Sequence, residues 1–565
     1  MKLSNRIKIL STIARWRLTW DKRDTNCKVP GLDNPKFMSA MEAVRLIPDG
    51  AGVISSGMAA NARCSIFYWG IKELYLKTGH PRDLVWMGVG AMGSRGRVPG
   101  TLEELDFPGV LAGYIGGHLE TIKAQLRLAD KGNMFLGTLP QGIMGYLMEA
   151  QARGEDSVLS DVGVGTFLDP RVGSGSQILT GIGPQLVTVE GDLLRYTMPK
   201  IDIAMFVLPY ADSEGNLYAH NAATLTECKP STYAARGNGG KVLATVSGII
   251  LKDPSRIYIP ADKVDAIVVN PRSEQTGTVP QRKYWPLFTV GGNEDINEGV
   301  EQLKFVNNIL KITPTRGDAE NALARLAAQV FARTVRPGAY VNIGVGLPEE
   351  VCRLVYEGGL YKDVTFGCET GVLGGMPAMG IYFGSAVCPR EMMSSAEIFH
   401  IWENKLDLTI LGLLEADSEG NVNVSKRGEG AINYVGPGGF PNLVRSAKNI
   451  LFIGSWMAHA KFAIEDGRLV IRKTGEPKFK EKVSQITFSG RQALLQGKNV
   501  YYVTNVGVFR LTARGMELSQ IMPGIDLERD VIKCCPMKIV LPEDGRVPVV
   551  EDSVVTGKGF NLKWP

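Results

Sequence analysis

Histidine is scarce in this chain, with five in 565 residues, and none lies in an HExxH or HxH pattern. The eight cysteines include no CxxC pair, and the adjacent Cys534 and Cys535 suit neither a zinc knuckle nor an easy disulfide. The sequence therefore predicts no metal site. Free cysteines in this number are typical of a reducing compartment, which favours a cytoplasmic protein.

Long apolar runs and an overall charge excess are also missing. No segment has about 18 consecutive apolar residues, so we expect no membrane-spanning helix. The net charge of +5 equals the charge of residues 1–20 alone, which contain no acid. The remaining chain is neutral on balance, whereas nucleic-acid-binding proteins usually carry a basic stripe on the folded body. We expect no nucleic-acid partner.

The basic segment at the start of the chain has a helical pattern. Leu3, Ile7, Leu10 and Ile13 recur at helical spacing with Lys and Arg between them, which predicts an amphipathic helix. We treat residues 1–36 as a basic N-terminal extension. It is either an arm that packs on the body or on a partner subunit, or a mitochondrial presequence, which would place the protein in the matrix instead.

Several catalytic motifs are absent. The chain has no GxxxxGK[ST] phosphate loop and no GxSxG nucleophile elbow. One GxGxxG occurs at residues 88–93, but Ser-Arg-Gly-Arg follows it and is not helix material, so a dinucleotide site there is disfavoured.

Glycine, by contrast, is abundant: 66 residues, about 12%, against an average usage of roughly 7%. Short β-branched runs alternate with longer amphipathic stretches, which indicates an α/β fold with largely parallel sheets. The segments that predict buried strands are 85–89, 203–208, 265–269, 408–413, 450–453 and 499–503, and helices are expected over 139–153 and 319–336.

An internal repeat divides the chain. Residues 201–216 and 406–421 both run from a buried strand into Asp-Ser-Glu-Gly-Asn, at an offset of 205 residues, and a second echo pairs residues 48–57 with 336–346. We infer two homologous domains in tandem. The predicted organisation is an N-terminal domain over 37–300, a linker over 301–318, a C-terminal domain over 319–540 and a tail over 541–565.

Glu369 is the candidate nucleophile. It follows a short β-rich run and precedes Gly371, Gly374 and Gly375, which would leave room for a ligand to approach. An ionised carboxylate can act as a nucleophile without a general base. The alternative is a glutamate that only caps the turn. At the repeat offset, Glu369 corresponds to Val164, so one half carries the acid and the other does not.

An ordered set of motifs makes the chain resemble the family I CoA-transferases, in the form where both halves are fused and closest to the acetate/propionate/3-oxoacid group. The resemblance spans about residues 37 to 540. The motifs are Tyr-Ile-Gly-Gly-His at 114–118, Leu-Pro-Gln-Gly at 139–142, Val-Asn-Ile-Gly-Val-Gly at 341–346, Cys-Glu-Thr-Gly at 368–371, Gly-Pro-Gly-Gly-Phe at 436–440 and Pro-Gly-Ile-Asp-Leu-Glu-Arg-Asp at 523–530.

The resemblance implies a CoA-transferase, with Glu369 in the position of the family's catalytic acid. The implied mechanism is ping-pong: Glu369 takes CoA from an acyl-CoA as a glutamyl thioester and passes it to a second, short-chain acid. Coenzyme A is then a substrate, and no other cofactor is needed. A homodimer or homotetramer is the family tendency.

The same resemblance supplies the other site residues. The Gln141 amide and backbone N–H groups of Gly438 and Gly439 would be oxyanion donors. Residues expected near the CoA and acyl groups are Asn342, Gly344, Gly346, Gly371, Gly374 and Gly375. Residues 398–405 depart from the family's glycine-rich pattern, and the candidates for the substrate pocket are Gly117, His118, Phe399, His400 and Trp402.

Other functions stay open at this stage. An acyl-CoA hydrolase on the same scaffold would also need Glu369, and a non-catalytic acyl-CoA-binding protein would not need it. A phosphosugar isomerase with a related core is a remote alternative. The sequence does not name the donor and acceptor pair, for which acetate, propionate, butyrate, acetoacetate and lactate are all candidates, and a larger or aromatic acid is possible if residues 398–405 border the acyl pocket.

Overall fold

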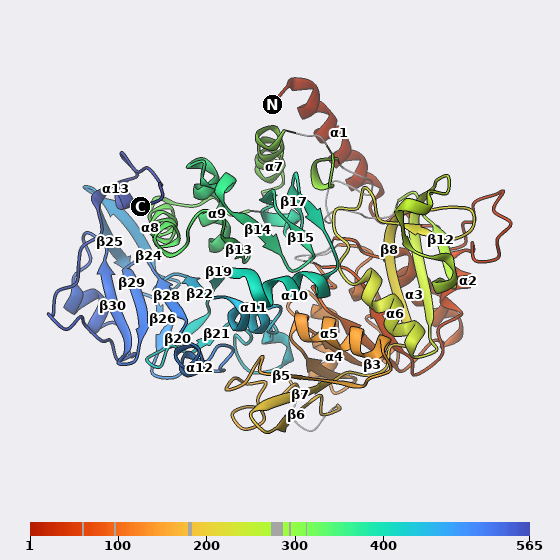
Figure 1. The fold of residues 1–565 in the computed structure, drawn as a ribbon, viewed down its shortest axis with the longest axis horizontal. Coiled ribbons are helices and arrows are strands. Elements are labelled where there is room, and N and C mark those ends of the chain that lie inside the picture. Colours follow the sequence, from red (N-terminus) through yellow and green to blue (C-terminus); the bar gives the residue numbers. More distant parts are fainter. Residues whose placement is uncertain (59–60, 95–97, 179–182, 273–285, 293–294, 312) are drawn as a thin grey trace.

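Two large β-sheets lie side by side along the long axis of the molecule, one built by each half of the chain (Figure 1). The computed structural model describes the whole chain except residues 59–60, 95–97, 179–182, 273–285, 293–294 and 312. The α/β class with largely parallel sheets in tandem is confirmed.

The first sheet has nine strands, and seven of them run parallel in the order β12-β10-β8-β1-β2-β3-β4. Two short antiparallel strands, β9 and β11, extend it. The strands are β1 (Gly52–Ser55), β2 (Leu84–Gly88), β3 (Leu111–Gly116), β4 (Phe135–Thr138), β8 (Ile203–Ala211), β9 (Leu217–Tyr218), β10 (Lys241–Ile249), β11 (Ile257–Ile259) and β12 (Ala266–Val269).

The second sheet also has nine strands, in the order β18-β15-β14-β13-β19-β22-β28-β29-β30, and the five from β14 to β28 are parallel. Its strands are β13 (Tyr340–Ile343), β14 (Thr365–Cys368), β15 (Val372–Leu373), β18 (Glu391–Met392), β19 (Leu406–Gly412), β22 (Asn449–Ile453), β28 (Asn499–Val503), β29 (Gly507–Thr512) and β30 (Gly515–Ile521). Smaller sheets use β5 (Ser157–Ser160), β6 (Val187–Glu190), β7 (Leu193–Thr197), β16 (Met376–Pro377), β17 (Ala386–Val387), β20 (Glu415–Asp417), β21 (Val422–Asn423), β23 (Met457–Ala458), β24 (Lys461–Glu465), β25 (Arg468–Lys473), β26 (Glu476–Pro477) and β27 (Phe479–Lys480).

The two sheets repeat one topology. Reading β12-β10-β8-β1-β2 beside β28-β22-β19-β13-β14 pairs strands in the same spatial order and the same sequence order. The central residues of these strands are mostly buried on both faces, which explains why their sequences read as short continuous apolar runs. The internal repeat seen in the sequence is therefore a repeat of structure.

The shared Asp-Ser-Glu-Gly-Asn turn has the same hydrogen bonds in both halves. Asp212 Oδ1 accepts from the backbone N–H groups of Glu214 and Asn216, both at 3.0 Å, and its Oδ2 accepts from the Asn216 side chain at 2.9 Å. Asp417 makes the equivalent three bonds at 3.1, 3.0 and 3.2 Å. One aspartate thus ties together each turn that follows a central strand.

The helices are short and mostly cover the sheets. They are α1 (Leu3–Thr19), α2 (Ala40–Val44), α3 (Ser65–Thr78), α4 (Lys123–Asp130), α5 (Gln141–Ala152), α6 (Cys228–Gly237), α7 (Ile296–Leu310), α8 (Asp318–Thr334), α9 (Leu347–Glu357), α10 (Ser395–Lys405), α11 (Phe440–Ser446), α12 (Gly490–Leu495) and α13 (Asp552–Thr556). The predicted helices over 139–153 and 319–336 correspond to α5 and α8.

An insertion in the first half creates the contact between the halves. Between β2 and β8 the chain adds β3, β4, α4, α5 and the small sheet β5–β7, whereas the second half spans the equivalent interval with the short strands β15 to β18 and α10. Helix α5 contacts α10 and α11 of the second half. At its first turn, Asn442 Oδ1 accepts from the Gly142 N–H at 3.1 Å.

Helices occur near both ends of the chain and in the described part of the predicted linker. Residues 301–310 of the predicted linker belong to α7, because Val300, Leu303 and Val306 form a buried face. In the predicted tail, α13 packs on α8, where the Arg325 Nε–H donates to the Val554 carbonyl at 2.6 Å. The predicted N-terminal helix is α1, which contacts α7. No helix in the described ranges is long and apolar enough to cross a membrane.

We expect Asp212→Ala to lower the free energy of unfolding by about 2–4 kcal/mol, because it leaves the buried Asn216 amide and Tyr218 hydroxyl without their acceptor. Chemical denaturation with a matched Ser213→Ala control measures this, since Ser213 is exposed in the same turn. Equal stability of the two variants would contradict the structural role of the aspartate.

Candidate active site

Glu369 lies at the carboxyl end of β14, directly after the last residue of the strand. Its side chain is buried, with 9% of its surface exposed. The Cys368 thiol donates to Glu369 Oε2 at 3.3 Å. In parallel α/β sheets, ligands bind beyond the carboxyl ends of the strands, so this placement fits a reactive group.

The environment of Glu369 is poor in charge. Burial raises the pKa of the Glu369 carboxyl, and hydrogen bonds from its own backbone, the Cys368 thiol and the Asn342 amide lower the pKa and oppose that shift. Within the described parts of the chain, Glu369 forms no ion pair. The carboxylate is thus weakly solvated and held by neutral donors, which leaves its oxygen lone pairs available for chemistry.

Gly439 brings three of the predicted residues to one corner. A β-carbon placed on Gly439 would lie 2.9 Å from Cγ of Glu369, 3.0 Å from Oε1 of Gln141 and 3.1 Å from Cζ of Phe399. Such distances leave no room for a side chain, so glycine is required there. The structure therefore brings Glu369, Gln141, Gly439 and Phe399 together at one corner.

Backbone hydrogen bonds across the two halves hold this corner together. The Gln141 N–H donates to the Gly438 carbonyl at 3.0 Å, and the Gly438 N–H donates to the Gly117 carbonyl at 2.7 Å. Gly117 also packs on Gln141, whose Cγ would lie 2.6 Å from a β-carbon at Gly117. Because the Gly438 N–H is already used, only Gly439 of the two predicted backbone donors has an N–H without an acceptor in the described chain.

The predicted CoA loop lies beside the nucleophile. Asn342 is buried on β13 next to β14, accepts from the Thr409 hydroxyl at 3.1 Å and donates to the Gly367 carbonyl at 3.3 Å. Gly344 packs on the Ile410 carbonyl, whereas Gly346 (φ +92°) has open space around it and begins α9. The loop therefore reaches the same edge of the sheet as Glu369.

Gly371, Gly374 and Gly375 have no room for a side chain. All three have positive φ, and a β-carbon on them would lie 1.9 Å from the Met393 carbonyl, 2.4 Å from Arg390 Nε and 2.3 Å from the Val387 carbonyl. That they lie near the CoA and acyl groups stays a prediction. These glycines allow the chain after Glu369 to turn and pack closely.

The three aromatic candidates for the substrate pocket on α10 lie in different surroundings. Phe399 and Trp402 are buried and form an edge-to-face pair with centroids 5.4 Å apart, and Trp402 packs against Gly367 of β14, behind the nucleophile. His400 is exposed on the other side of α10, where its Nε2 lies 2.8 Å from Glu149 Oε2. In the described contacts His400 meets Glu149 and not Glu369, and its place in the substrate pocket stays a prediction.

His118 lies at the junction of the two halves, and none of its described contacts is with Glu369. It is half-buried, and its α-carbon would lie 3.3 Å from a β-carbon at Gly436. The next residue, Leu119, donates its N–H to the Val435 carbonyl at 2.8 Å.

The sequence analysis did not identify Glu227, which is a second buried carboxylate. It precedes α6 in the first half, and its Oε2 accepts from the Gly57 N–H at 3.3 Å. The adjoining Thr226 N–H donates to the Thr370 carbonyl at 3.2 Å, one residue beyond Glu369. Burial, as the largest influence, raises the pKa of Glu227 to about 7. The internal repeat could have identified Glu227. Helix α6 corresponds to α11, so Glu227 and Gly439 precede equivalent helices.

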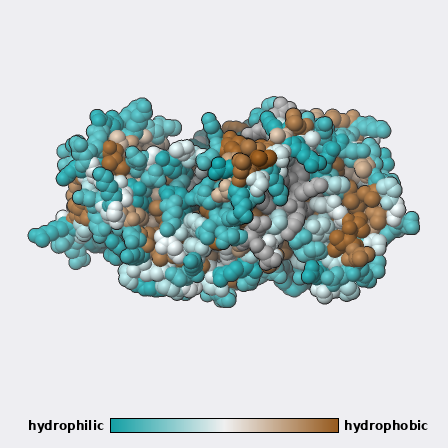
Figure 2. Space-filling view, turned by 90° about the horizontal axis from the view of Figure 1, so that it is seen from above, coloured by the Kyte–Doolittle hydropathy of each residue, from teal (hydrophilic) through white to brown (hydrophobic). Residues whose placement is uncertain are grey.

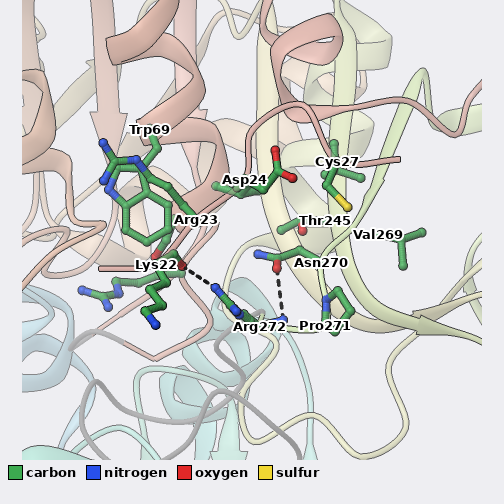
Figure 3. A pocket seen from close by; sticks show the side chains of 14 residues that line it. Lys22, Arg23, Asp24, Cys27, Trp69, Thr245, Val269, Asn270, Pro271 and Arg272 are labelled. Atoms are coloured by element: carbon green, nitrogen blue, oxygen red, sulfur yellow. Dashed lines mark hydrogen bonds between the residues drawn. The ribbon is translucent and has the colours of Figure 1, made fainter. Parts of the chain in front are cut away.

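A separate cavity of about 240 Å³ lies in the first half, and Figure 3 shows its lining. Cationic side chains surround Trp69 there, and the Arg272 side chain donates to the Lys22 carbonyl at 3.1 Å. None of the predicted site residues lines this cavity. In the described part of the chain, no cluster of three or more His, Cys, Asp or Glu side chains could hold a metal ion.

We expect Glu227→Gln to stabilise the protein at alkaline but not at acidic pH. The folded state keeps the Glu227 proton up to about pH 7, whereas the unfolded chain loses it near 4.5, so stability falls as the pH rises between these values. The full loss is about 3 kcal/mol. The test is the melting temperature of each variant from pH 5 to pH 8, with Glu476→Gln as the exposed control. If the difference in melting temperature between Glu227→Gln and the wild type stays constant with pH, the prediction is contradicted.

Comparison with known proteins agrees with this geometry. The model of the family described as "Coenzyme A transferase" matches residues 325–533. The caffeate CoA-transferase of Acetobacterium woodii is 32% identical over 510 residues, which cover 88% of this chain and 93% of that protein. The acetate CoA-transferase YdiF of Escherichia coli K12 is 30% identical over 510 residues, 88% of this chain and 91% of that one.

A solved structure shows the same architecture. The acyl-CoA transferase YdiF of E. coli O157:H7, crystallised as a thioester complex with CoA, superposes with a TM-score of 0.81 at 26% identity. The match covers 94% of this chain and 97% of that chain. Both halves of the molecule are thus shared with a fused transferase. This protein belongs to the family I CoA-transferases, in their single-chain form, and is a CoA-transferase enzyme.

Proposed function

We propose that the enzyme transfers CoA from an acyl-CoA to a free carboxylic acid through a glutamyl-CoA thioester on Glu369. The proposal rests on the corner at Gly439. There the buried carboxylate of Glu369, which has no ion-pair partner in the described chain, lies beside the side-chain amide of Gln141 and the free backbone N–H of Gly439. A nucleophile and donors for an oxyanion are therefore present together.

Each step exchanges one acyl bond for another. The Glu369 carboxylate attacks the thioester carbonyl and expels the CoA thiolate, which leaves a mixed anhydride on the enzyme. The thiolate then attacks the glutamyl carbonyl, which releases the first acid as its carboxylate and forms the glutamyl-CoA thioester. A second carboxylate attacks that thioester, and the same two steps in reverse give the new acyl-CoA and free Glu369. No proton, ATP or redox cofactor is consumed.

The oxyanion of each tetrahedral intermediate needs donors. The Gln141 side-chain amide and the Gly439 N–H lie at the corner and suit this role, and each such donor typically contributes about 2.7–4 kcal/mol. Gly438 serves the site differently, because its N–H donates to Gly117 and its carbonyl accepts from Gln141. It positions the loop instead of stabilising the oxyanion.

Burial also suits the nucleophile. A carboxylate with a raised pKa is more basic when ionised, and the loss of its water shell removes a barrier to attack. Hydrogen bonds from Cys368 and Asn342 lower the pKa of Glu369 and so oppose the effect of burial. The site therefore balances reactivity against ionisation.

Phe399 supports a preference for short-chain acids. Its Cζ would lie 3.1 Å from a β-carbon at Gly439, so the ring closes the site beside the reacting atoms. A small acyl group such as acetyl or propionyl needs little space there. The A. woodii relative is named for caffeate, an aromatic acid, which makes the size of this wall the natural test of acid choice.

Further properties belong to the same proposal. Coenzyme A enters as a substrate, with no other cofactor, and the Gly344–Gly346 loop lies where the thiol end would approach Glu369. We propose a homodimer or homotetramer in the cytoplasm, as the family tendency and the free cysteines favour.

Acetyl-CoA alone should load the enzyme with CoA. Peptide mass spectrometry is expected to find CoA on the peptide that contains Glu369, absent from Glu369→Ala and present in the exposed control Glu476→Ala. Adding single carboxylic acids and following the loss of the adduct identifies the acceptor. Rapid loss in buffer alone would favour a hydrolase, and no adduct from several acyl-CoA donors would contradict the covalent mechanism.

Phe399→Ala should widen the acid preference. We expect kcat/KM for an aromatic acid such as cinnamate to rise relative to that for acetate by roughly tenfold or more, because the wall beside Gly439 is removed. The ratio of the two values is the measurement, since lost stability alone does not change it. Ile401→Ala on the same helix is the control, and an equal ratio in both variants would show that Phe399 does not border the acid.

A further inference from the structure

Helix α1 leaves an apolar stripe unpartnered. Its inward face is anchored by Ile9 and Trp16, which are buried, and Arg6 stacks over the Phe305 ring of α7 with 5.7 Å to the centroid. On the outward face, the exposed fractions are 71% for Leu3, 59% for Ile7, 45% for Leu10 and 76% for Leu18. The periodicity that predicted an amphipathic helix is real, but most of its apolar residues face solvent.

These residues form one continuous stripe. Leu3, Ile7, Leu10, exposed Ala14 and Leu18 are spaced by four, three, four and four residues, which keeps them within an arc of about 80° on a helix with 3.6 residues per turn. Helix α1 projects from the side that faces the viewer in Figure 2, where brown patches stand among teal ones. Exposed apolar surface of this kind marks interaction sites.

The charge around the stripe is of one sign. Lys2, Arg6, Lys8, Arg15 and Arg17 are all exposed, and none forms an ion pair within the described parts of the chain. Helical geometry places Arg6 and Arg17 along one edge of the stripe and Lys8 and Arg15 along the other. Helix α1 contains no acidic residue. The stripe is thus bordered on both sides by cations.

We propose that α1 attaches the enzyme to the surface of an anionic phospholipid bilayer. Acyl chains would cover Leu3, Ile7, Leu10 and Leu18, while phosphate headgroups would meet the flanking Lys and Arg side chains. A second copy of the chain is the poorer occupant, because pairing two stripes would bring ten cations together with no acid between them. The helix lies on the bilayer and does not span it.

The experiment uses the full-length protein and sedimentation with vesicles. We expect the bound fraction on phosphatidylcholine vesicles with about 30 mol % phosphatidylglycerol to exceed that on pure phosphatidylcholine by about tenfold, and to fall when salt is raised from about 0.05 to 0.5 M. Equal binding to both vesicles, or none to either, would overturn the proposal.

Variants distinguish binding by this stripe from nonspecific adsorption through other exposed apolar residues. Ile7→Ser with Leu18→Ser should lower binding to anionic vesicles at least about fivefold. Leu495→Ser with Val549→Ser is the matched control, because those side chains are 72% and 64% exposed elsewhere and should leave binding unchanged. Melting temperature and circular dichroism verify that both double variants fold. If the Ile7/Leu18 variant instead lowers the mass in analytical ultracentrifugation while vesicle binding is unchanged, the partner is a second copy and the lipid assignment is wrong.

Discussion

The junction between the two halves is the constraint on which the active site depends. The Gly438 N–H donates to the Gly117 carbonyl, and the Gln141 N–H donates to the Gly438 carbonyl, so one turn of the second half is held by two segments of the first. This turn presents Gly439 to Glu369 and Phe399. Gln141 is the first residue of α5, which belongs to the insertion in the first half, so this insertion supplies the amide side chain beside Gly439.

Two buried carboxylates lie along this junction, and burial affects them differently. Glu369 accepts hydrogen bonds from Cys368 and Asn342, and its side chain lies at the corner beside Gly439. Glu227 precedes α6, the counterpart of α11, so its place in the first half corresponds to that of Gly439 and not to that of Glu369. Its pKa of about 7 means that near neutrality it holds its proton about half of the time. Burial of Glu227 therefore lowers stability as the pH rises from 4.5 to about 7.

The positions of the central strands, the repeat and the strand-end placement of Glu369 could be predicted because each depends on local sequence. Buried parallel strands read as short apolar runs, the Asp-Ser-Glu-Gly-Asn turn marks the same place twice, and Glu369 follows a strand directly. The linker prediction for residues 301–310 depended on the polar turn segments around them and overlooked the helical spacing of Val300, Leu303 and Val306. Motif matching names a segment but not the face of α10 on which His400 lies, so its contact with Glu149 was not predicted.

The sequence by itself determined the class of fold, the duplication and the candidate carboxylate, since apolar periodicity, turn residues and motif order are properties of neighbouring residues. Only the tertiary structure decided which part of the protein each glycine packs against. Gly371, Gly374 and Gly375 face the backbone or side chains of residues 387–393, whereas Gly439 faces Glu369. It also decided that the apolar residues of α1 point outward, because a helical pattern defines a stripe but not what covers it. Contacts between residues hundreds of positions apart depend on how the elements pack, and local sequence carries no record of that.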